Sequence, residues 1–468
     1  MRGPRRIIVL YGLLIGALWP HTGRAVPIKE GDRWTINLDG ALKGYGLAMH
    51  MAYPWTAVAA MGWSSRSALM GLGDARLKFT GSYKDRVKWK VHLRTVGLIS
   101  SQPGATQGLS GGVGALAEPA RSLPMQYTDS DDPSVIWKSE VDRLAVKIRI
   151  WKLDVTIGRQ AIGFGVGFVW QPADLLGTFS PLEVDREFKP GLDALRIDWA
   201  LGQFTSLTLV GVAGGPPCRH VQVPTPSSPL TPSKWSTPDG KTCSPGRPSF
   251  DPNHSALAMR LRTTVGNFDL GALIGYIRGD IVAGLFAAGA IGRWKLRAEA
   301  TLTHDLDAND LDGPYWSPVN DFVRAVVGFN YAFHTKKSLS ILAEFYYNGF
   351  GTWDRTAYLR RATLARVAEF AEVSNLGMIY AATGLQWQPA DRLSTTFLAM
   401  ANLRDPSVHL SLTAEFNLTD NSSLAVGGFL PIGKSPNLDF TGSLPELKSR
   451  SEFGLYPTMI FTEYKRYF

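Results

Sequence analysis

The feature that most constrains this chain is a strict alternation of apolar and polar residues. In Arg86–Arg94, "RVKWKVHLR", Val, Trp, Val and Leu alternate with Arg, Lys and His. Arg293–Thr303 and Val408–Leu418 repeat the pattern. Successive side chains of a β-strand point to opposite sides, so this period gives a strand one apolar and one polar face. A helix would spread the same charges around its circumference. The pattern therefore predicts strands whose two faces meet different surroundings.

Similar segments recur to the end of the chain. We expect about 18 strands, with about 16 as the alternative count, because boundaries read from a sequence shift by a few residues. The segments are residues 33–50, 72–83, 86–98, 141–150, 153–162, 191–200, 204–213, 255–265, 267–278, 281–290, 292–304, 321–333, 337–348, 376–388, 391–403, 407–418, 420–431 and 452–467.

The connections between these segments alternate between short turns and mostly long loops. Short turns include Tyr83–Arg86 and Leu418–Asn421. The long loops are residues 51–71, 99–140, 163–190, 214–254, 305–320, 349–375 and 432–451. Turns on one side and longer loops on the other are typical of a transmembrane β-barrel. A soluble β-sandwich, the alternative, does not sort its loops by length in this way.

The predicted fold class is therefore all-β, a transmembrane antiparallel up-and-down β-barrel. The aromatic content of 11% and the mean hydropathy of −0.04 fit a wall with one apolar and one polar face. Beyond the N-terminal region, no apolar run approaches the ~20 residues that a transmembrane helix needs.

The N-terminal segment has the pattern of a secretory signal peptide. Arg2, Arg5 and Arg6 precede a short apolar run, Ile7–Trp19, and small residues follow at Gly23–Ala25. We expect residues 1–25 to be removed and residues 26–468 to form the barrel domain; a buried first helix is the alternative. Removal of residues 1–25 leaves a net charge of about +5. The remaining chain contains no run of Lys and Arg residues, so no nucleic-acid partner is expected.

Two cysteines, Cys218 and Cys243, lie within the long loop 214–254. An exported chain passes through an oxidising compartment, so a disulfide between them is the default expectation. Two unpaired thiols are the alternative.

Two stretches resemble a known class of protein. The chain ends "TMIFTEYKRYF", and Tyr464 and Phe468 match the terminal aromatic signal that the outer-membrane assembly machinery of Gram-negative bacteria reads. Residues 157–199, "IGRQAIGFGVGFVWQPADLL…KPGLDALRIDW", resemble a segment of Gram-negative porin-like barrels, including relatives of the alginate-export channels. The resemblance implies a location in the outer membrane, with its lipid and lipopolysaccharide as partners.

Loop 163–190 interrupts this resemblance segment. Its "GFGVGF" allows close backbone approach, which suits a loop packed inside a barrel. We expect it to bring Asp174, Glu183, Asp185 and Arg186 to a constriction of the lumen; a solvated external loop is the alternative.

The polar faces of the strands are mainly basic. The candidate pore-lining residues are Arg76, Lys78, Lys88, Lys90, Arg94, Lys147, Arg149, Arg196, Arg260, Arg262, Arg293, Lys295, Arg297 and Arg324. Acids in the same phase are fewer, namely Asp74, Asp154, Asp198, Glu299, Glu344 and Glu415. An excess of cations in a pore raises the local anion concentration. The alternative is a closed interior in which these charges pair with one another.

Two loops carry further patterns. In 349–375, Leu359, Ala362, Val367 and Phe370 recur near helical spacing, so a short helix is expected, whose arginines could meet lipopolysaccharide phosphates. His304–Gly313, "HDLDANDLDG", clusters acids but lacks the EF-hand turn glycine and terminal Glu, so a solvated loop is favoured over a Ca²⁺ site. No metal or cofactor is predicted.

These observations predict a channel for passive diffusion of small hydrophilic, preferentially anionic, solutes. A plugged barrel that serves as an adhesin or scaffold is the alternative. A hydrolase inside the barrel is the weaker alternative, because no HExxH motif is present, and no enzyme activity is expected.

Overall fold

The structure, a computed structural model, describes residues 26–31, 33–60, 63–102, 119–129, 132, 134–177, 187–216, 219–221, 234–236, 246–306, 321–368, 370, 372–439 and 446–468. The predicted signal peptide, both cysteines and most of the acidic segment 304–313 lie outside these residues.

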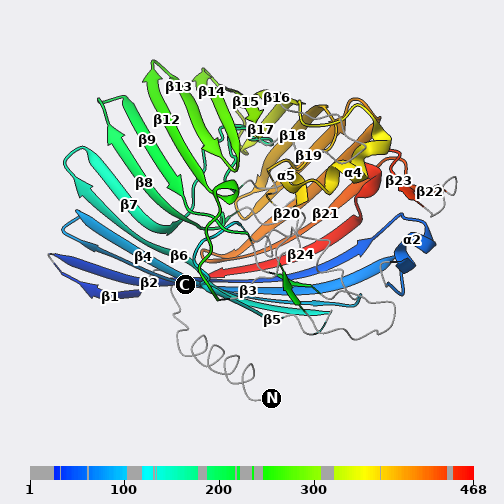
Figure 1. The fold of residues 1–468 in the computed structure, drawn as a ribbon, viewed down its shortest axis with the longest axis horizontal. Coiled ribbons are helices and arrows are strands. Elements are labelled where there is room, and N and C mark those ends of the chain that lie inside the picture. The colour runs from blue at the N-terminus through cyan, green and yellow to red at the C-terminus, as the bar shows by residue number, and fades with distance from the viewer. Residues whose placement is uncertain are drawn as a thin grey trace.

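Within the described residues, eighteen strands form one closed antiparallel barrel (Figure 1). They are β2 (Trp34–His50), β3 (Ser67–Tyr83), β4 (Val87–Ser100), β6 (Val135–Ile150), β7 (Leu153–Gln160), β8 (Leu192–Ala200), β9 (Thr205–Val212), β12 (Ala256–Val265), β13 (Phe268–Ile277), β14 (Asp280–Ile291), β15 (Trp294–Asp305), β16 (Asp321–Ala332), β17 (Leu339–Asn348), β18 (Ile379–Ala390), β19 (Leu393–Asn402), β20 (Ser407–Thr419), β21 (Ser422–Ile432) and β24 (Thr458–Tyr467). Each pairs with the next, and β24 pairs with β2 to close the ring. Each of the predicted segments overlaps one of these strands, so the predicted all-β barrel is confirmed.

Exposure alternates along the strands in the phase that the sequence predicts. On β3, Leu69 is 65% exposed and Met70 only 5%; on β15, Leu302 is 49% exposed and Thr303 is fully buried. The exposed apolar residues form the outer face, and the polar residues face the lumen. A Lys or Arg on a lipid face costs ~2–4 kcal/mol at the midplane, and this cost fixes the phase of every strand.

Short turns join the strands at the end of the barrel where β24 ends. Between β3 and β4, Lys84 and Asp85 adopt positive φ angles of 46° and 54°, the backbone of a tight hairpin turn. The opposite end carries the long connections, with two short exceptions at residues 278–279 and 403–406. In Figure 1, α2 (Trp55–Ala60) and the β22–β23 hairpin lie toward the end with long loops, and β1 lies toward the other.

The smaller elements were mostly not predicted. They are β1 (Val26–Glu30), β5 (Gln126–Asp129), β10 (Arg219–Val221), β11 (Lys234–Ser236), β22 (Asn437–Asp439), β23 (Glu446–Lys448), α4 (Tyr358–Ala362), α5 (Ala365–Ala368) and the 3₁₀ turns η1 (Pro252–His254), η3 (Arg355–Ala357) and η4 (Phe453–Leu455). The helix expected in 349–375 consists of two short helices, α4 and α5. Among the described residues, no helix combines the length and apolarity needed to cross a membrane.

Strand β6 is longer than predicted. It begins at Val135, not at residue 141, and its pairing with β4 contains a bulge. Val141 lies opposite Leu93 and Arg143 opposite His92, so Asp142 is an extra residue. The bulge reverses the alternation, which explains why a strict period of two located only the second half of this strand.

Candidate functional site

The chain between β7 and β8 folds against the inner wall of the barrel. Glu299 of β15 accepts hydrogen bonds from the backbone N–H groups of Val166 (2.6 Å) and Ala173. Glu344 of β17 accepts from three consecutive N–H groups, those of residues 168–170, at 2.7 Å for Val169. The carboxylates of Glu299 and Glu344, on β15 and β17, therefore hold the first half of this loop.

The glycines of "GFGVGF" make this path compact. A Cβ atom at Gly167 would lie 1.8 Å from the carbonyl oxygen of Trp170, so only glycine fits there. Phe164 is buried together with Ile162 and Leu175 in an apolar cluster with side chains of β8, β9 and β12–β14.

The returning half of the loop contacts the seam where the barrel closes. Glu187 accepts from the Nζ of Lys43 on β2 (2.6 Å) and from the hydroxyl of Tyr467 on β24 (2.6 Å). Lys189 donates to both carboxylate oxygens of Asp174, at 2.5 Å to Oδ2. The described parts of the loop thus contact β15 and β17 as well as β24 and β2.

Of the four residues predicted at a constriction, the structure describes one. Asp174 is 4% exposed and is occupied by its ion pair with Lys189. Glu183, Asp185 and Arg186 lie outside the described residues.

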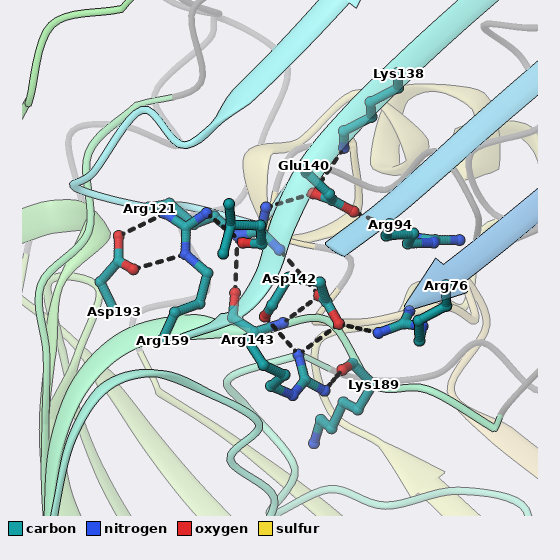
Figure 2. Close-up of polar contacts among 12 residues, drawn as sticks. Arg76, Arg94, Arg121, Lys138, Glu140, Asp142, Arg143, Arg159, Lys189 and Asp193 are labelled. Atoms are coloured by element: carbon teal, nitrogen blue, oxygen red, sulfur yellow. Dashed lines mark hydrogen bonds and ion pairs between the residues drawn. The ribbon is translucent and has the colours of Figure 1, made fainter. Parts of the chain in front are cut away.

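A network of buried charges lies where β3, β4 and β6 meet this loop (Figure 2). At its centre, Asp142 accepts from the guanidinium groups of Arg76 and Arg143, the latter at 2.9 Å. Arg143 also donates to the carbonyl oxygen of Lys189. The bulge of β6 presents Asp142 and Arg143 to the same side, and this arrangement ties the wall to the loop.

Glu140 forms the second centre of the network. Its oxygens accept from Arg121 (2.6 Å) and Arg94 (3.3 Å), and the Nζ of Lys138 lies 3.5 Å away. Arg94 also donates to Asp74 at 2.7 and 2.9 Å. Removal of one partner from such a buried set leaves an unpaired charge, at a cost of ~3–5 kcal/mol.

The resemblance segment supplies a further buried pair. Arg159 of "GRQ" and Asp193 of "GLD" lie opposite each other on β7 and β8 and form two parallel bonds of 2.7 and 3.0 Å. Arg159 also donates to the carbonyl oxygens of Val141 (3.0 Å) and Leu123 (2.5 Å). Neither Arg159 nor Asp193 is among the predicted site residues, although the spacing of the motif that contains them is visible in the sequence.

The fourteen candidate pore-lining residues fall into three groups by their contacts. Eight form ion pairs: Arg76, Lys78, Arg94, Lys147, Arg149, Arg196, Arg262 and Arg324. Arg297 donates to the carbonyl oxygen of Val166 (2.7 Å) beneath the ring of Phe168 (3.9 Å). Within the described part of the chain, the other five have no ion pair: Lys88, Lys90, Arg260, Arg293 and Lys295. Arg293 lies in the turn before β15, not in a strand.

The inner faces of β4, β6, β7 and β8, toward the short turns, form a surface that we call the basic wall. It consists of Lys88, Lys90, Lys147, Arg149 and Arg196. The side chains of Lys147, Arg149 and Arg196 are 38%, 54% and 34% exposed, and in the described part of the chain they form ion pairs with Asp154 and Asp198. Five cations therefore meet two carboxylates in a region that remains partly exposed.

The inner faces of β16–β19 are covered instead, and we call this region the covered wall. Trp170 and Phe453 are buried there against Tyr346 and Tyr380, with the rings of Trp170 and Tyr346 stacked at 5.2 Å. Two inward-folded segments, the loop after β7 and residues 449–456, supply these aromatic side chains.

Glu452 links the covered wall to the loop at residues 349–378. Its oxygens accept from the hydroxyl of Tyr380, the backbone N–H of Leu376 (3.0 Å) and the amide of Asn375 (3.2 Å). Asn375 in turn accepts from the indole N–H of Trp170 (2.7 Å). Burial raises the pKa of Glu452 above its usual value, against the opposing effect of these hydrogen bonds.

Arg366 of α5 holds the same loop to the barrel wall. It binds Asp280 on β14 (2.7 Å), Asp305 on β15 (3.1 Å) and Glu372 (3.4 Å). Burial alone would raise the pKa of Glu372, but Arg324 and Arg366 outweigh it and lower the pKa. The expectation that the arginines of this loop meet lipopolysaccharide does not hold for Arg366, whose charge is satisfied internally.

The C-terminal residue lies at the closing seam. The backbone N–H of Phe468 donates to the carbonyl oxygen of Gly40 (3.1 Å), and its carbonyl accepts from the N–H of Gly40 (2.8 Å). The ring covers Gly40 so closely that a Cβ atom there would lie 2.4 Å from it.

No protein-family model matches the sequence, and no curated protein matches it either. Solved structures do resemble the fold. OccAB1 of Acinetobacter baumannii matches with a TM-score of 0.52 and 9% identity, over 96% of this chain and 99% of that chain. OccK9 (OpdG) of Pseudomonas aeruginosa matches with a TM-score of 0.51 and 10% identity, over 92% and 98%. A BenF-like porin from Pseudomonas fluorescens Pf-5 gives 0.48 and 11%, over 92% and 99%.

The closed eighteen-strand barrel with an inward-folded loop defines the class by its fold: an all-β, antiparallel up-and-down β-barrel. Within that class the chain is similar in fold to the two Occ proteins, and at 9% and 10% identity the likeness is one of fold alone.

Proposed function

We propose that this channel passes small hydrophilic solutes by passive diffusion and prefers anions. The basic wall carries the proposal, because among the described residues the ion pairs of its five cations involve two carboxylates on a partly exposed inner surface. Inside a low-dielectric barrel such an excess raises the local concentration of anions. No chemical step is required of any residue.

The loop after β7 supports a constriction at mid-barrel. Its described residues are anchored on Glu299 and Glu344 at one side and on Lys43 at the other. A solute that follows the lumen would pass between this loop and the basic wall. Asp174 and Lys189 neutralise each other there, so the selectivity that we propose comes from the wall and not from this pair.

Reversal potential in planar bilayers tests the proposal. In a KCl gradient the refolded wild-type protein should conduct and favour Cl⁻ over K⁺. Replacement of Lys88, Lys90 and Lys147 by Glu should move the reversal potential toward cation preference, because it inverts the charge of the basic wall. The control replaces Lys336 and Lys337, exposed residues of the β16–β17 turn, by Glu. Equal reversal potentials for the wild type and the triple variant would contradict the proposal.

A plugged barrel that acts as an adhesin or scaffold is the second candidate. The inward-folded segments of the covered wall favour it, because they fill part of the lumen with packed aromatic side chains. Absence of any conductance from correctly folded wild-type protein would support this candidate over the channel.

We also propose roles for the two chain ends and for the cysteine loop. Residues 1–25 serve as the signal peptide, and Phe468 is read by the outer-membrane assembly machinery. Of the arginines in the helical part of loop 349–375, Arg360 contacts lipopolysaccharide, whereas Arg361 and Arg366 are buried. Cys218 and Cys243 form a disulfide that shapes the external loop. Both thiols should resist maleimide before reduction and react after it; labelling of the unreduced protein would reject the disulfide.

A further inference from the structure

Phe188 occupies an unusual position on the returning half of the loop after β7. Three cations surround its ring: Arg76 at 4.3 Å from the ring centroid, Lys43 at 4.7 Å and Lys78 at 4.9 Å. They come from β2 and β3, which pair along their whole length, so the three charges lie on one patch of the inner wall. The negative face of an aromatic ring attracts such cations, by ~0.5–2 kcal/mol for a well-placed pair.

The ring lies over cations that water hardly reaches. Arg76 is 3% exposed and Lys43 is 5% exposed, although both belong to the polar face of their strands. On the basic wall, by contrast, the side chain of Arg149 is 54% exposed. The difference lies in the loop, since residues 187–189 pass over β2 and β3 and not over the basic wall.

One of the acids that pair with these three cations is shared with other arginines. Lys43 pairs with Glu187, Lys78 with Asp39 and Arg76 with Asp142. Asp142, however, is shared with Arg143 and Arg121, so it cannot neutralise Arg76 alone. Uncovering this patch would therefore add positive potential to the lumen.

We propose that Phe188 is a specificity-determining residue: it covers Lys43, Arg76 and Lys78 and withholds their charge from solutes in the lumen. The basic wall is then left as the surface that sets the anion preference. This inference rests on the proposed channel function.

Two other phenylalanines of the same loop repeat the arrangement. The ring of Phe168 lies 3.9 Å from the guanidinium of Arg297 on β15. The ring of Phe164 lies 5.8 Å from the guanidinium of Arg260 on β12, whose nearer ring, at 4.2 Å, is that of Phe286 on β14. Phenylalanines of the loop thus meet lumenal cations at three places, and Phe188 meets the largest group.

Chemical labelling tests the cover without any need for conductance. Folded wild-type protein and Phe188→Ala are treated with a small, water-soluble amine-reactive ester, and modification of Lys43 and Lys78 is measured by mass spectrometry. Labelling of both lysines should rise several-fold in the variant, relative to Lys336 in the same molecule. Phe188→Leu, which keeps most of the bulk, should give an intermediate result. If Phe188→Ala fails to fold, Phe188→Val takes its place. Equal labelling of Lys43 in wild type and variant would overturn the inference.

Ion selectivity then tests the functional consequence. Phe188→Ala should increase the preference for Cl⁻ over K⁺ by roughly two-fold or more, since newly exposed cations act on permeating ions. Phe250→Ala, at a phenylalanine that is 68% exposed, is the matched control and should change nothing. If the wild-type protein does not conduct, the proposed channel function is rejected. The labelling experiment then still tests whether Phe188 shields Lys43 and Lys78. If the wild-type protein conducts and Phe188→Ala shows increased labelling but unchanged ion selectivity, Phe188 does not determine specificity.

Discussion

The basic wall and the covered wall have the same strand pattern but opposite surroundings. On β4, β6 and β8, lumenal lysines and arginines remain partly exposed, whereas on β16–β19 the lumenal positions lie beneath Trp170, Phe453 and their neighbours. The alternation of each strand specifies only which side chains face inward. Whether those side chains meet water or a second layer of protein depends on where the long loops fold.

Loss of the loop anchor should give the largest effect, because it would uncover part of the covered wall. Glu344→Ala removes the acceptor of three backbone N–H groups, two of them buried, and each buried group left unsatisfied costs ~1–3 kcal/mol. We expect the loop after β7 to detach, with higher single-channel conductance and new protease cleavage in residues 161–177. Glu415→Ala is the control, because Glu415 is a lumenal carboxylate that accepts from Ser423 alone in the described contacts. Unchanged conductance and protection in Glu344→Ala would mean that this carboxylate does not hold the loop.

A second prediction compares buried and exposed ion pairs on neighbouring strands. Arg159→Ala leaves Asp193 buried without its bidentate partner and should lower the free energy of unfolding by ~3–5 kcal/mol. Arg149→Ala breaks a pair of similar geometry whose arginine is solvent-exposed, and no measurable loss is expected. Urea unfolding in detergent, followed by the heat-modifiable shift on gels, measures both. Similar losses in the two variants would show that burial does not distinguish these pairs.

The smallest effect concerns pH and sharpens the description of the covered wall. Because burial raises the pKa of Glu452 in the folded protein, the folded state binds a proton there more tightly than the unfolded state. The contribution of Glu452 to stability should therefore improve as pH falls from neutral through the raised pKa toward the ordinary value of 4.5. In Glu452→Gln that part of the pH dependence should disappear. Identical pH profiles of unfolding for wild type and Glu452→Gln would refute this account.

Much of the barrel could be predicted because a strand with the wrong alternation would turn charged side chains toward lipid. A charged residue turned toward lipid is costly, so segments such as Arg86–Arg94 keep a period of two that is visible without any structure. The prediction failed where that rule is locally broken. The bulge at Asp142 reverses the alternation of β6, and the first half of that strand, including Glu140, was therefore assigned to a loop.

The partners of the inward charges could not be predicted, because they come from distant parts of the chain. Arg76 meets Asp142, Glu187 meets Lys43, and Glu452 meets Tyr380, each pair at least 66 residues apart. No spacing rule connects such residues, since barrel closure and loop paths bring them together. Several of the cations predicted to line the pore therefore form ion pairs or lie beneath phenylalanine rings.

Most strands and their inward faces can be predicted from the sequence, because the contrast between lipid and water acts on every residue of a strand separately; the first half of β6 is the exception. Which inward charges remain accessible depends on tertiary contacts. That outcome depends on the loop after β7, which reaches Glu344 on one side and Lys43 on the other, and on Phe188, whose ring meets three cations of β2 and β3. Such contacts depend on the closed ring as a whole, and they have no signature within any one segment of the chain.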